Sequence, residues 1–179
     1  MSRAADALGV VRIAAAAAFP PALARTVDVP RGGSIPLLLF LVAAATDFFD
    51  GRLARRSGTT SRHGAVLDIA ADVTFVLGAA TTGAALGLVP WTTPVAIAAA
   101  AGSYGLASAR AGHLAYSPIG HAAGVGNYGL AGLLAGAVAF PGSGVARTLG
   151  VASLFVTTIN LAAVVGRLVP RRTGSSSTG

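Results

Sequence analysis

The sequence predicts an all-α integral membrane protein with six transmembrane helices and both termini in the cytoplasm. Hydrophobic residues make up 54% of the 179 residues, charged residues make up only 11%, and the mean hydropathy is +0.71. A soluble globular domain contains about 25% charged residues. This composition therefore excludes a disordered chain and argues against an ordinary soluble enzyme. Six apolar stretches also have about the 17 to 25 residues that a helix needs to cross a bilayer.

The six stretches follow one another along the chain, and prolines 90, 94, 118 and 141 lie between them or at their ends, where helices stop. We expect Pro20 and Pro21 to kink or end the first helix. Small residues, as in Gly78–Gly83, allow membrane helices to approach closely. We expect residues 1–172 to form a single membrane domain and the Gly/Ser/Thr-rich residues 173–179 to form a disordered tail. The approximate bounds of the stretches are Leu8–Ala24, Ser34–Gly51, Gly64–Leu88, Thr93–Ala109, Ala122–Phe140 and Thr148–Arg167.

The distribution of arginines predicts the orientation. With six spans and the N-terminus inside, ten of the thirteen arginines lie on the inner side, as the positive-inside rule requires. Although Ala22–Ala24 resembles a cleavage site, Arg12 interrupts the first apolar stretch, so we expect a retained helix rather than a cleaved signal peptide. The Ala-rich, Lys-free composition suggests a bacterium. We therefore expect a multi-pass protein of the inner (plasma) membrane whose active site faces the cytoplasm.

The net charge of +7 does not indicate a nucleic-acid partner, because the arginines are scattered between apolar stretches rather than gathered in a patch. The sequence has no cysteine, which excludes disulfides and thiolate metal sites. All six carboxylates are aspartates, and four of them lie at the ends of apolar stretches. These four carry the functional signal.

Asp47 and Asp50 are three residues apart at the end of the second stretch, and Asp68 and Asp72 are four apart near the start of the third. Each pair therefore shares one helical face. A short linker lets the two faces meet at the cytoplasmic end of an antiparallel helix pair. If submerged and unpaired, four carboxylates cost on the order of 10 kcal/mol. Divalent metals relieve this cost, because Mg²⁺ prefers oxygen ligands and paired metals support displacement at phosphorus.

Two other interpretations also fit these aspartates. They can pair with neighbouring arginines such as Arg52 and Arg62, as buried acids often do. A small cation transporter also buries acids among its helices. Neither interpretation accounts for the matched faces together with the fixed spacing of the residues between them.

The full string from Asp47 to Asp72 is more specific than the four acids alone. It reads Asp47-Phe-Phe-Asp50-Gly51-Arg-Leu-Ala54-Arg55, then eight residues, then Gly64-Ala-Val-Leu-Asp68-Ile-Ala-Ala-Asp72. This string resembles the motif of the CDP-alcohol phosphatidyltransferase family, D-x2-D-G-x2-A-R-x8-G-x3-D-x3-D, at all eight fixed positions. The six-helix layout extends the resemblance over most of the chain.

The resemblance implies transfer of a phosphatidyl group from a CDP-alcohol such as CDP-diacylglycerol to a small alcohol, with release of CMP. It also implies two Mg²⁺ or Mn²⁺ ions held by the four aspartates, with Asp72 in addition the general base on the acceptor hydroxyl. A homodimer is typical of the family. The implied contacts to the CDP donor are Gly51, Ala54, Arg55, Ser61 and Gly64.

The acceptor alcohol is less well defined. The motif region looks closest to the phosphatidylglycerophosphate synthase branch, which favours glycerol 3-phosphate. That branch usually has a lysine after the last motif aspartate and G-K-x-K-T before the fifth helix, where this chain has Val73 and Gly120–Gly124. Inositol phosphate or another polar alcohol therefore remains an alternative acceptor. Arg110 and His121 are the candidate acceptor contacts.

Two further interpretations complete the sequence analysis. A noncatalytic CDP-lipid-binding protein is an alternative to an enzyme, but the complete aspartate set argues against it. The aromatic residues Trp91, Tyr104, Tyr116 and Tyr128 fit an interfacial belt without a ligand.

Overall fold

The computed structural model describes residues 3–27, 33–57 and 62–169, and the side chains of 3–9, 12, 27, 47–57, 62–65 and 67 lie outside this description. Within these ranges the chain forms six α-helices and one short 3-10 helix, with no strand, which confirms the expected all-helical class. The predicted tail lies outside the described residues. The elements are α1 (Arg3–Ala24), η1 (Arg25–Val27), α2 (Ser34–Ser57), α3 (Arg62–Ala85), α4 (Thr92–Ala111), α5 (Pro118–Ala139) and α6 (Val145–Leu168).

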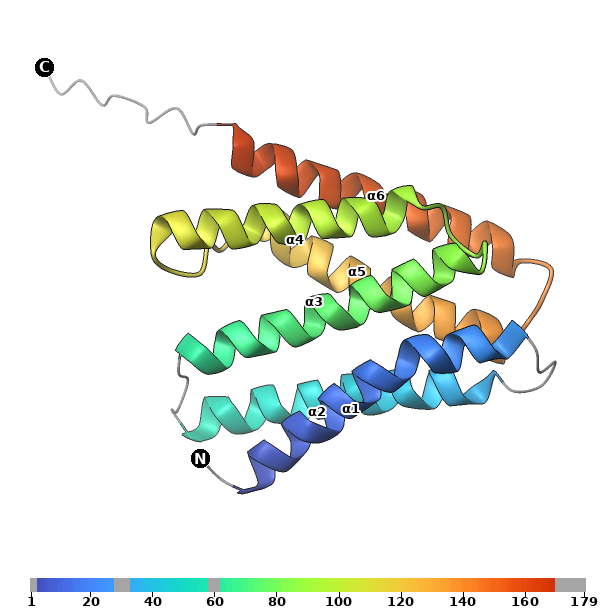
Figure 1. The fold of residues 1–179 in the computed structure, drawn as a ribbon, viewed down its shortest axis with the longest axis horizontal. Helices are drawn as coiled ribbons and strands as arrows, with labels where there is room; N and C mark the ends of the chain where they lie inside the picture. Colours follow the sequence, from blue (N-terminus) through green and yellow to red (C-terminus); the bar gives the residue numbers. More distant parts are fainter. Residues whose placement is uncertain (1–2, 28–32, 58–61, 170–179) are drawn as a thin grey trace, which may run out of the picture.

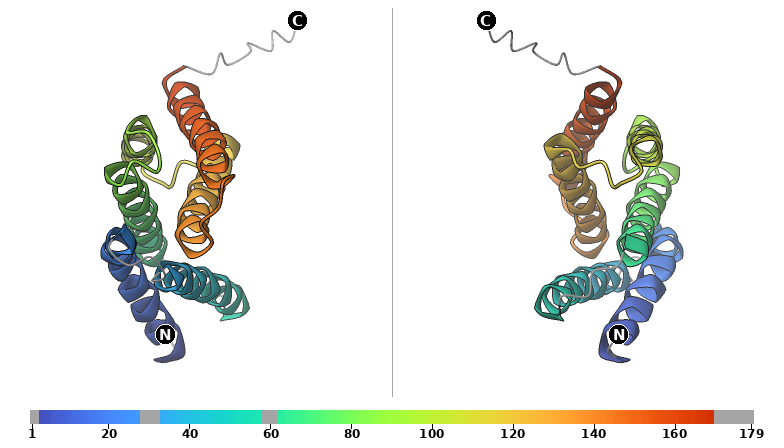
Figure 2. Two further views of the ribbon diagram at one scale, coloured as in Figure 1. Left: turned by 90° about the vertical axis from the view of Figure 1, so that its right-hand side faces the viewer. Right: turned by 90° about the vertical axis from the view of Figure 1, so that its left-hand side faces the viewer.

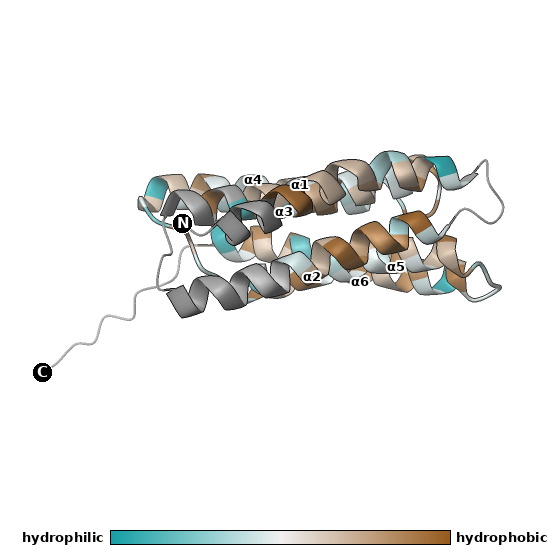
Figure 3. Ribbon diagram, turned by 90° about the horizontal axis from the view of Figure 1, so that it is seen from below, coloured by the Kyte–Doolittle hydropathy of each residue, from teal (hydrophilic) through white to brown (hydrophobic). Residues whose placement is uncertain are grey.

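The helices lie in two layers of three (Figures 1 and 2). One layer contains α1, α3 and α4, and the other contains α2, α5 and α6, as the view along the layers shows (Figure 3). Within the layers, α3 packs against α1 and α4, and α5 packs against α2 and α6. Across the layers, α1 faces α2, α3 faces α5 and α4 faces α6. Helices α3 and α5 therefore lie in the middle of their layers, and each contacts both outer helices of its own layer.

Local signals explain where the central helices begin and end. The Ser117 hydroxyl accepts a hydrogen bond from the Gly120 backbone N–H at 3.2 Å, and Pro118 occupies the start of α5. A Ser cap followed by Pro is a typical helix start. Helix α4 ends at Gly112, whose φ of 71° lies in the left-handed region that glycine adopts without a Cβ penalty. The loop between α4 and α5 is thus fixed at both ends.

Pro20 and Pro21 do not end the first helix, because α1 continues to Ala24, the end that the apolar stretch predicts; a kink at these prolines stays a prediction. Phe19 and Leu23, on either side of the proline pair, are both fully buried, so core packing holds the last turn in place. The small residues of α3 allow this packing, as expected. A Cβ on Gly78 would lie 3.0 Å from Pro20 Cγ.

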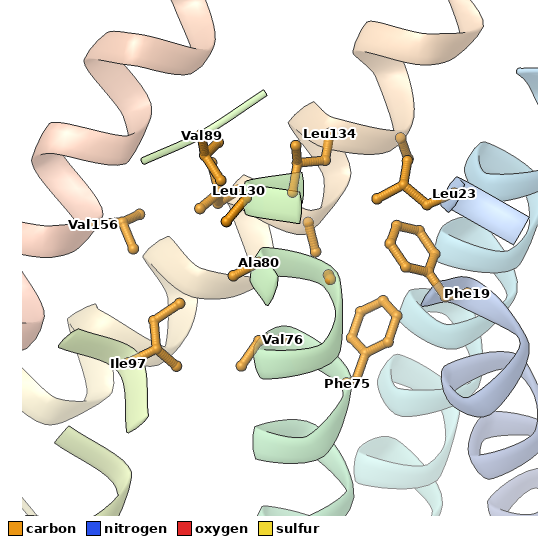
Figure 4. Close-up of a cluster of buried hydrophobic side chains, with 14 of the residues drawn as sticks. Phe19, Leu23, Phe75, Val76, Ala80, Val89, Ile97, Leu130, Leu134 and Val156 are labelled. Atoms are coloured by element: carbon orange, nitrogen blue, oxygen red, sulfur yellow. The ribbon is translucent and has the colours of Figure 1, made fainter. Parts of the chain in front are cut away.

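The core lies between the two layers (Figure 4). Phe19 on α1 meets Phe75 on α3 edge to face, with ring centroids 5.1 Å apart. Phe75 also packs against Tyr128 on α5 at 5.2 Å, and Tyr128 packs against Phe40 on α2 at 5.9 Å. This chain of rings joins four helices and buries the aromatic surface that dominates the energetics of such cores. It fixes the position of α3, on which two of the motif aspartates lie.

Two helices in the described part of the chain, α5 and α6, are long and apolar enough to cross a membrane by length and composition. Shorter apolar stretches occur at Ile13–Ala24 and Ser34–Thr46. Large apolar side chains face outward on α6, such as Leu154, which is 70% exposed, and Val151, which is 65% exposed. The number of spans and the orientation of the termini stay predictions.

Candidate active site

The motif aspartates Asp68 and Asp72 lie one helical turn apart on α3, and both side chains are partly buried. Residues four apart share a helical face, so these two carboxylates are neighbours, as the spacing predicts. The other predicted site residues on α2, at the start of α3 and in the linker between them have side chains outside the described residues. They are Asp47, Asp50, Gly51, Ala54, Arg55, Ser61 and Gly64, and the same holds for Arg62.

The backbone places both halves of the motif at the same end of the bundle. The C-terminal part of α2 and the N-terminal part of α3 lie at the left of Figure 1. In the described part of the chain, α1 packs against both helices, whereas α2 and α3 make few direct contacts. The described side chains contain no group of three or more potential metal ligands, since only two of the four aspartates are among them. The four-carboxylate site stays a prediction.

Asp72 lines a cavity of about 580 Å³ that is bounded by α3, α4, α5, α6 and the α4–α5 loop. Most of the lining side chains are apolar or small, as is usual for a small-molecule site with a few orienting polar groups. The polar groups come from four helices and one loop. They are Asp72, Tyr104, Tyr116, Ser117, His121, Asn127, Tyr128, Asn160 and Arg167.

Arg167, near the end of α6, brings a positive charge to this cavity. Its Nη1 donates hydrogen bonds to the Ala100 carbonyl oxygen at 3.0 Å and to Ser103 Oγ at 2.9 Å, both on α4. The guanidinium carbon lies 5.5 Å from the centroid of the Tyr104 ring, within the range of a cation–π contact. Its Nε is buried and has no hydrogen-bond partner within the described ranges. A buried donor without a partner is uncommon in folded proteins.

A pair of buried amides joins α5 and α6 at the cavity wall. Asn160 Nδ2 donates to Asn127 Oδ1 at 2.7 Å and to the Val156 carbonyl oxygen at 2.8 Å. Asn127 Nδ2 donates back to Asn160 Oδ1 at 3.4 Å. Asn160 is only 1% exposed, so these bonds satisfy groups that would otherwise be costly to bury. The pair fixes the register of the two helices that form this wall.

The two sequence-predicted acceptor residues have different positions. His121 lines the cavity from the first turn of α5, whereas Arg110 is exposed in the last turn of α4 and is not part of the lining. Tyr128 stacks in the aromatic chain of the core rather than in an interfacial belt. Tyr104 and Tyr116 also line the cavity, and the belt interpretation stays a prediction for them.

Sequence reasoning missed Arg167, Asn127 and Asn160 as cavity residues. The apolar pattern identifies Arg167 only as the end of the sixth stretch. A signal was present, because Asn160 and Arg167 lie seven residues, or about two turns, apart on an otherwise apolar helix. Polar residues inside an apolar helix usually face a cavity or a partner.

Comparison with protein families identifies the chain. The family model for CDP-alcohol phosphatidyltransferases matches residues 3–165. The chain belongs to this family. Membership confirms the resemblance drawn from the motif.

Similar curated proteins match over a shorter segment. They include CDP-diacylglycerol--glycerol-3-phosphate 3-phosphatidyltransferases of Yersinia enterocolitica, Yersinia pestis and Sodalis glossinidius. Each is 56% identical over 39 residues, which cover 22% of this chain and 21% of the relative. The matched part therefore spans about a fifth of the length of these relatives. No solved structure matches the chain.

Proposed function

We propose that this protein transfers a phosphatidyl group from CDP-diacylglycerol, or a similar CDP-alcohol, to the hydroxyl of a phosphate-bearing alcohol and releases CMP. The observation that carries this proposal is the position of Asp72. It completes the eight-residue motif of a family whose model matches residues 3–165, and it lines a cavity that also contains Arg167. One residue thus joins the donor motif to a pocket of the size of a small polar substrate.

In this proposal Asp72 acts as the general base. Its carboxylate takes the proton from the acceptor hydroxyl, and the oxygen forms a bond to the phosphorus that carries the lipid. The bond from that phosphorus to the CMP oxygen breaks, and CMP leaves with the electron pair. A positioned base of this kind contributes about 10² to 10⁴-fold to the rate.

The donor set suits divalent metals, because all four motif acids are aspartates and the two described ones are neighbours on α3. Carboxylate oxygens are the ligands that Mg²⁺ prefers. We assign Asp47, Asp50, Asp68 and Asp72 to hold two Mg²⁺ or Mn²⁺ ions. Metals held by these residues would supply positive charge to neutralise the pyrophosphate and to stabilise the leaving CMP.

The family motif assigns the remaining positions to the CDP donor. Gly51 and Ala54 keep the helix surface low for the nucleotide, and Gly64 does the same on α3. Arg55 contacts phosphate, for which the guanidinium fork is well shaped. Ser61 supplies a hydroxyl.

The acceptor carries a phosphate in this proposal, because Arg167 gives the cavity a fixed cation beside Tyr104 and His121. Glycerol 3-phosphate is the first candidate, since the curated relatives are named for it. Inositol phosphate has the same phosphate and is the second candidate.

We place the protein in the bacterial inner membrane as a six-span homodimer with the motif end toward the cytoplasm. Long helices with outward apolar side chains and the arginine distribution support the membrane placement, whereas the homodimer rests on what is typical of the family. The end of the bundle that carries the motif also carries Arg167 and the α4–α5 loop, so donor and acceptor enter from the same side.

The test is CMP release by purified protein in detergent. CDP-diacylglycerol and Mg²⁺ or Mn²⁺ are supplied, and glycerol 3-phosphate, inositol phosphate, serine and inositol are added one at a time. We expect release with a phosphate-bearing acceptor and none after EDTA treatment. Release with serine or inositol alone would contradict the assignment of the acceptor class. Folded protein that binds CDP-diacylglycerol yet releases no CMP would contradict the enzyme assignment.

A further inference from the structure

The guanidinium of Arg167 is held from the α4 side by a small hydrogen-bonded unit. Ser103 Oγ donates to the Ala100 carbonyl oxygen at 2.8 Å, and both oxygens accept from Arg167 Nη1. An arginine side chain has five N–H donors in a rigid fork. The two protons of Nη1 are therefore used on α4, which orients the plane of the guanidinium.

On the α5 side, Gly120 lies next to the guanidinium of Arg167 and leaves no room for a side chain. A Cβ at this position would lie 2.5 Å from Arg167 Nη2, closer than real Cβ contacts allow. The nearest other atoms to that Cβ are Arg167 Cζ and Ser117 Cβ, both at 3.6 Å. Any side chain at 120 would therefore push the guanidinium away from its present position. Gly129, on the same helix, has open space around its Cβ position.

A phosphate is bound best by two parallel N–H groups of one guanidinium, which requires a fixed plane. Arg167 lines the cavity, so a fixed guanidinium plane there suits an anionic group. We propose that Ser103 and Gly120 are positioning residues that hold the guanidinium of Arg167 in a fixed plane at the cavity wall, where it binds the phosphate of the acceptor. This inference rests on the proposed function, because it names how the acceptor site of that reaction is oriented.

The proposal explains why a glycine occupies the first turn of α5 beside a charged side chain. Alanine is a better helix former than glycine, so glycine costs helix stability at this position. In return, the absence of a side chain at Gly120 leaves space for the guanidinium of Arg167. The two positions act on Arg167 from opposite sides, so loss of either should weaken acceptor binding while donor binding stays unchanged.

The experiment compares Gly120→Ala and Ser103→Ala with the matched control Gly129→Ala in the full-length protein. The readouts are the KM for glycerol 3-phosphate, the KM for CDP-diacylglycerol, and calorimetric binding of glycerol 3-phosphate. We expect Gly120→Ala to raise the acceptor KM about tenfold or more, the range of a charged hydrogen bond, and Gly129→Ala to leave it unchanged. Ser103→Thr keeps the hydroxyl and should restore wild-type binding.

A double-mutant cycle tests whether Gly120 acts through Arg167. In the Arg167→Ala background, Gly120→Ala should have no further effect on acceptor binding. Additive losses, or an equal loss in Gly129→Ala, would overturn the inference. If the wild-type protein releases no CMP, the proposed function fails by itself. Calorimetry then decides the inference, since binding of glycerol 3-phosphate that Gly120→Ala weakens supports it and the absence of such weakening refutes it.

Discussion

The two sides of the candidate site, α2 with α3 and α4 with α6, are built in different ways. The first side carries its chemistry in a short string, in which Asp68 and Asp72 lie one turn apart on one helix. The second side assembles its polar groups from separate helices, so that Arg167 of α6 meets Ser103, 64 positions earlier in the chain. Local spacing predicts the first kind of site, whereas only tertiary packing creates the second.

The two sides also differ in the part of the reaction that we assign to each. The motif side carries the acids assigned to the donor, the metals and proton transfer, which are common to the family reaction. The cavity side carries a cation and a pair of amides, which suit the binding of one acceptor. Substitutions on the first side should therefore affect turnover, and those on the second side should affect acceptor binding or helix packing.

The largest expected effect is that of Asp72→Asn. The amide cannot accept the hydroxyl proton as a base, so CMP release should fall about 10² to 10⁴-fold. The thermal stability of the protein in detergent should stay close to wild type. Asp28→Asn, which removes a carboxylate outside the motif, is the control. Turnover that survives in Asp72→Asn would remove the general base from the proposal.

The next effect is that of Arg167→Ala on the cavity side. Loss of a charged partner for phosphate should raise the KM for glycerol 3-phosphate about 10- to 100-fold and change the KM for CDP-diacylglycerol little. Arg147, which is exposed at the start of α6, provides the matched control as Arg147→Ala. An equal rise in both KM values would show that the two sides do not divide the substrates as argued.

The number and order of the helices could be predicted from the sequence, and their bounds agree within a few residues for α4 and α6. Helix α2 continues to Ser57 rather than Gly51, because arginines such as Arg55 favour helix although they are not apolar. Helix α5 starts at Pro118 rather than Ala122, since the Ser117 cap defines its start better than hydropathy does. A search for apolar stretches long enough to cross a bilayer finds the apolar part of a helix. It misses polar residues that extend the helix at either end.

The candidate site was predictable only where its residues are close in sequence. The spacing of Asp68 and Asp72 on one face needs nothing beyond helix geometry. The link between Asp72 and Arg167 requires α3, α4, α5 and α6 to surround one cavity, which no local pattern encodes. The role of Gly120 likewise appears only when the position of a guanidinium from another helix is known.

A smaller effect is expected at the amide pair of α5 and α6. Asn127→Leu leaves Asn160 Oδ1 without its donor in a site that is 1% exposed, at a cost of about 1–3 kcal/mol. The double variant Asn127→Leu with Asn160→Leu removes both polar groups and should cost less than the sum of the single changes. Unfolding in detergent measures this coupling. Strict additivity would show that the two amides do not stabilise each other.

The smallest effect is expected between α4 and α6, where the hydroxyls of Thr93 and Thr157 lie 3.1 Å apart. Thr93→Val keeps the shape of a fully buried side chain and removes this one hydrogen bond. Hydrogen bonds between membrane helices average about 0.6 kcal/mol, so the free energy of unfolding should fall by about that amount. Thr158→Val is the control, because the exposed Thr158 hydroxyl bonds only to the Leu154 carbonyl oxygen of its own helix. A loss well above the average would mean that this contact also supports the cavity wall next to it, and the acceptor KM of Thr93→Val would then rise together with the loss of stability.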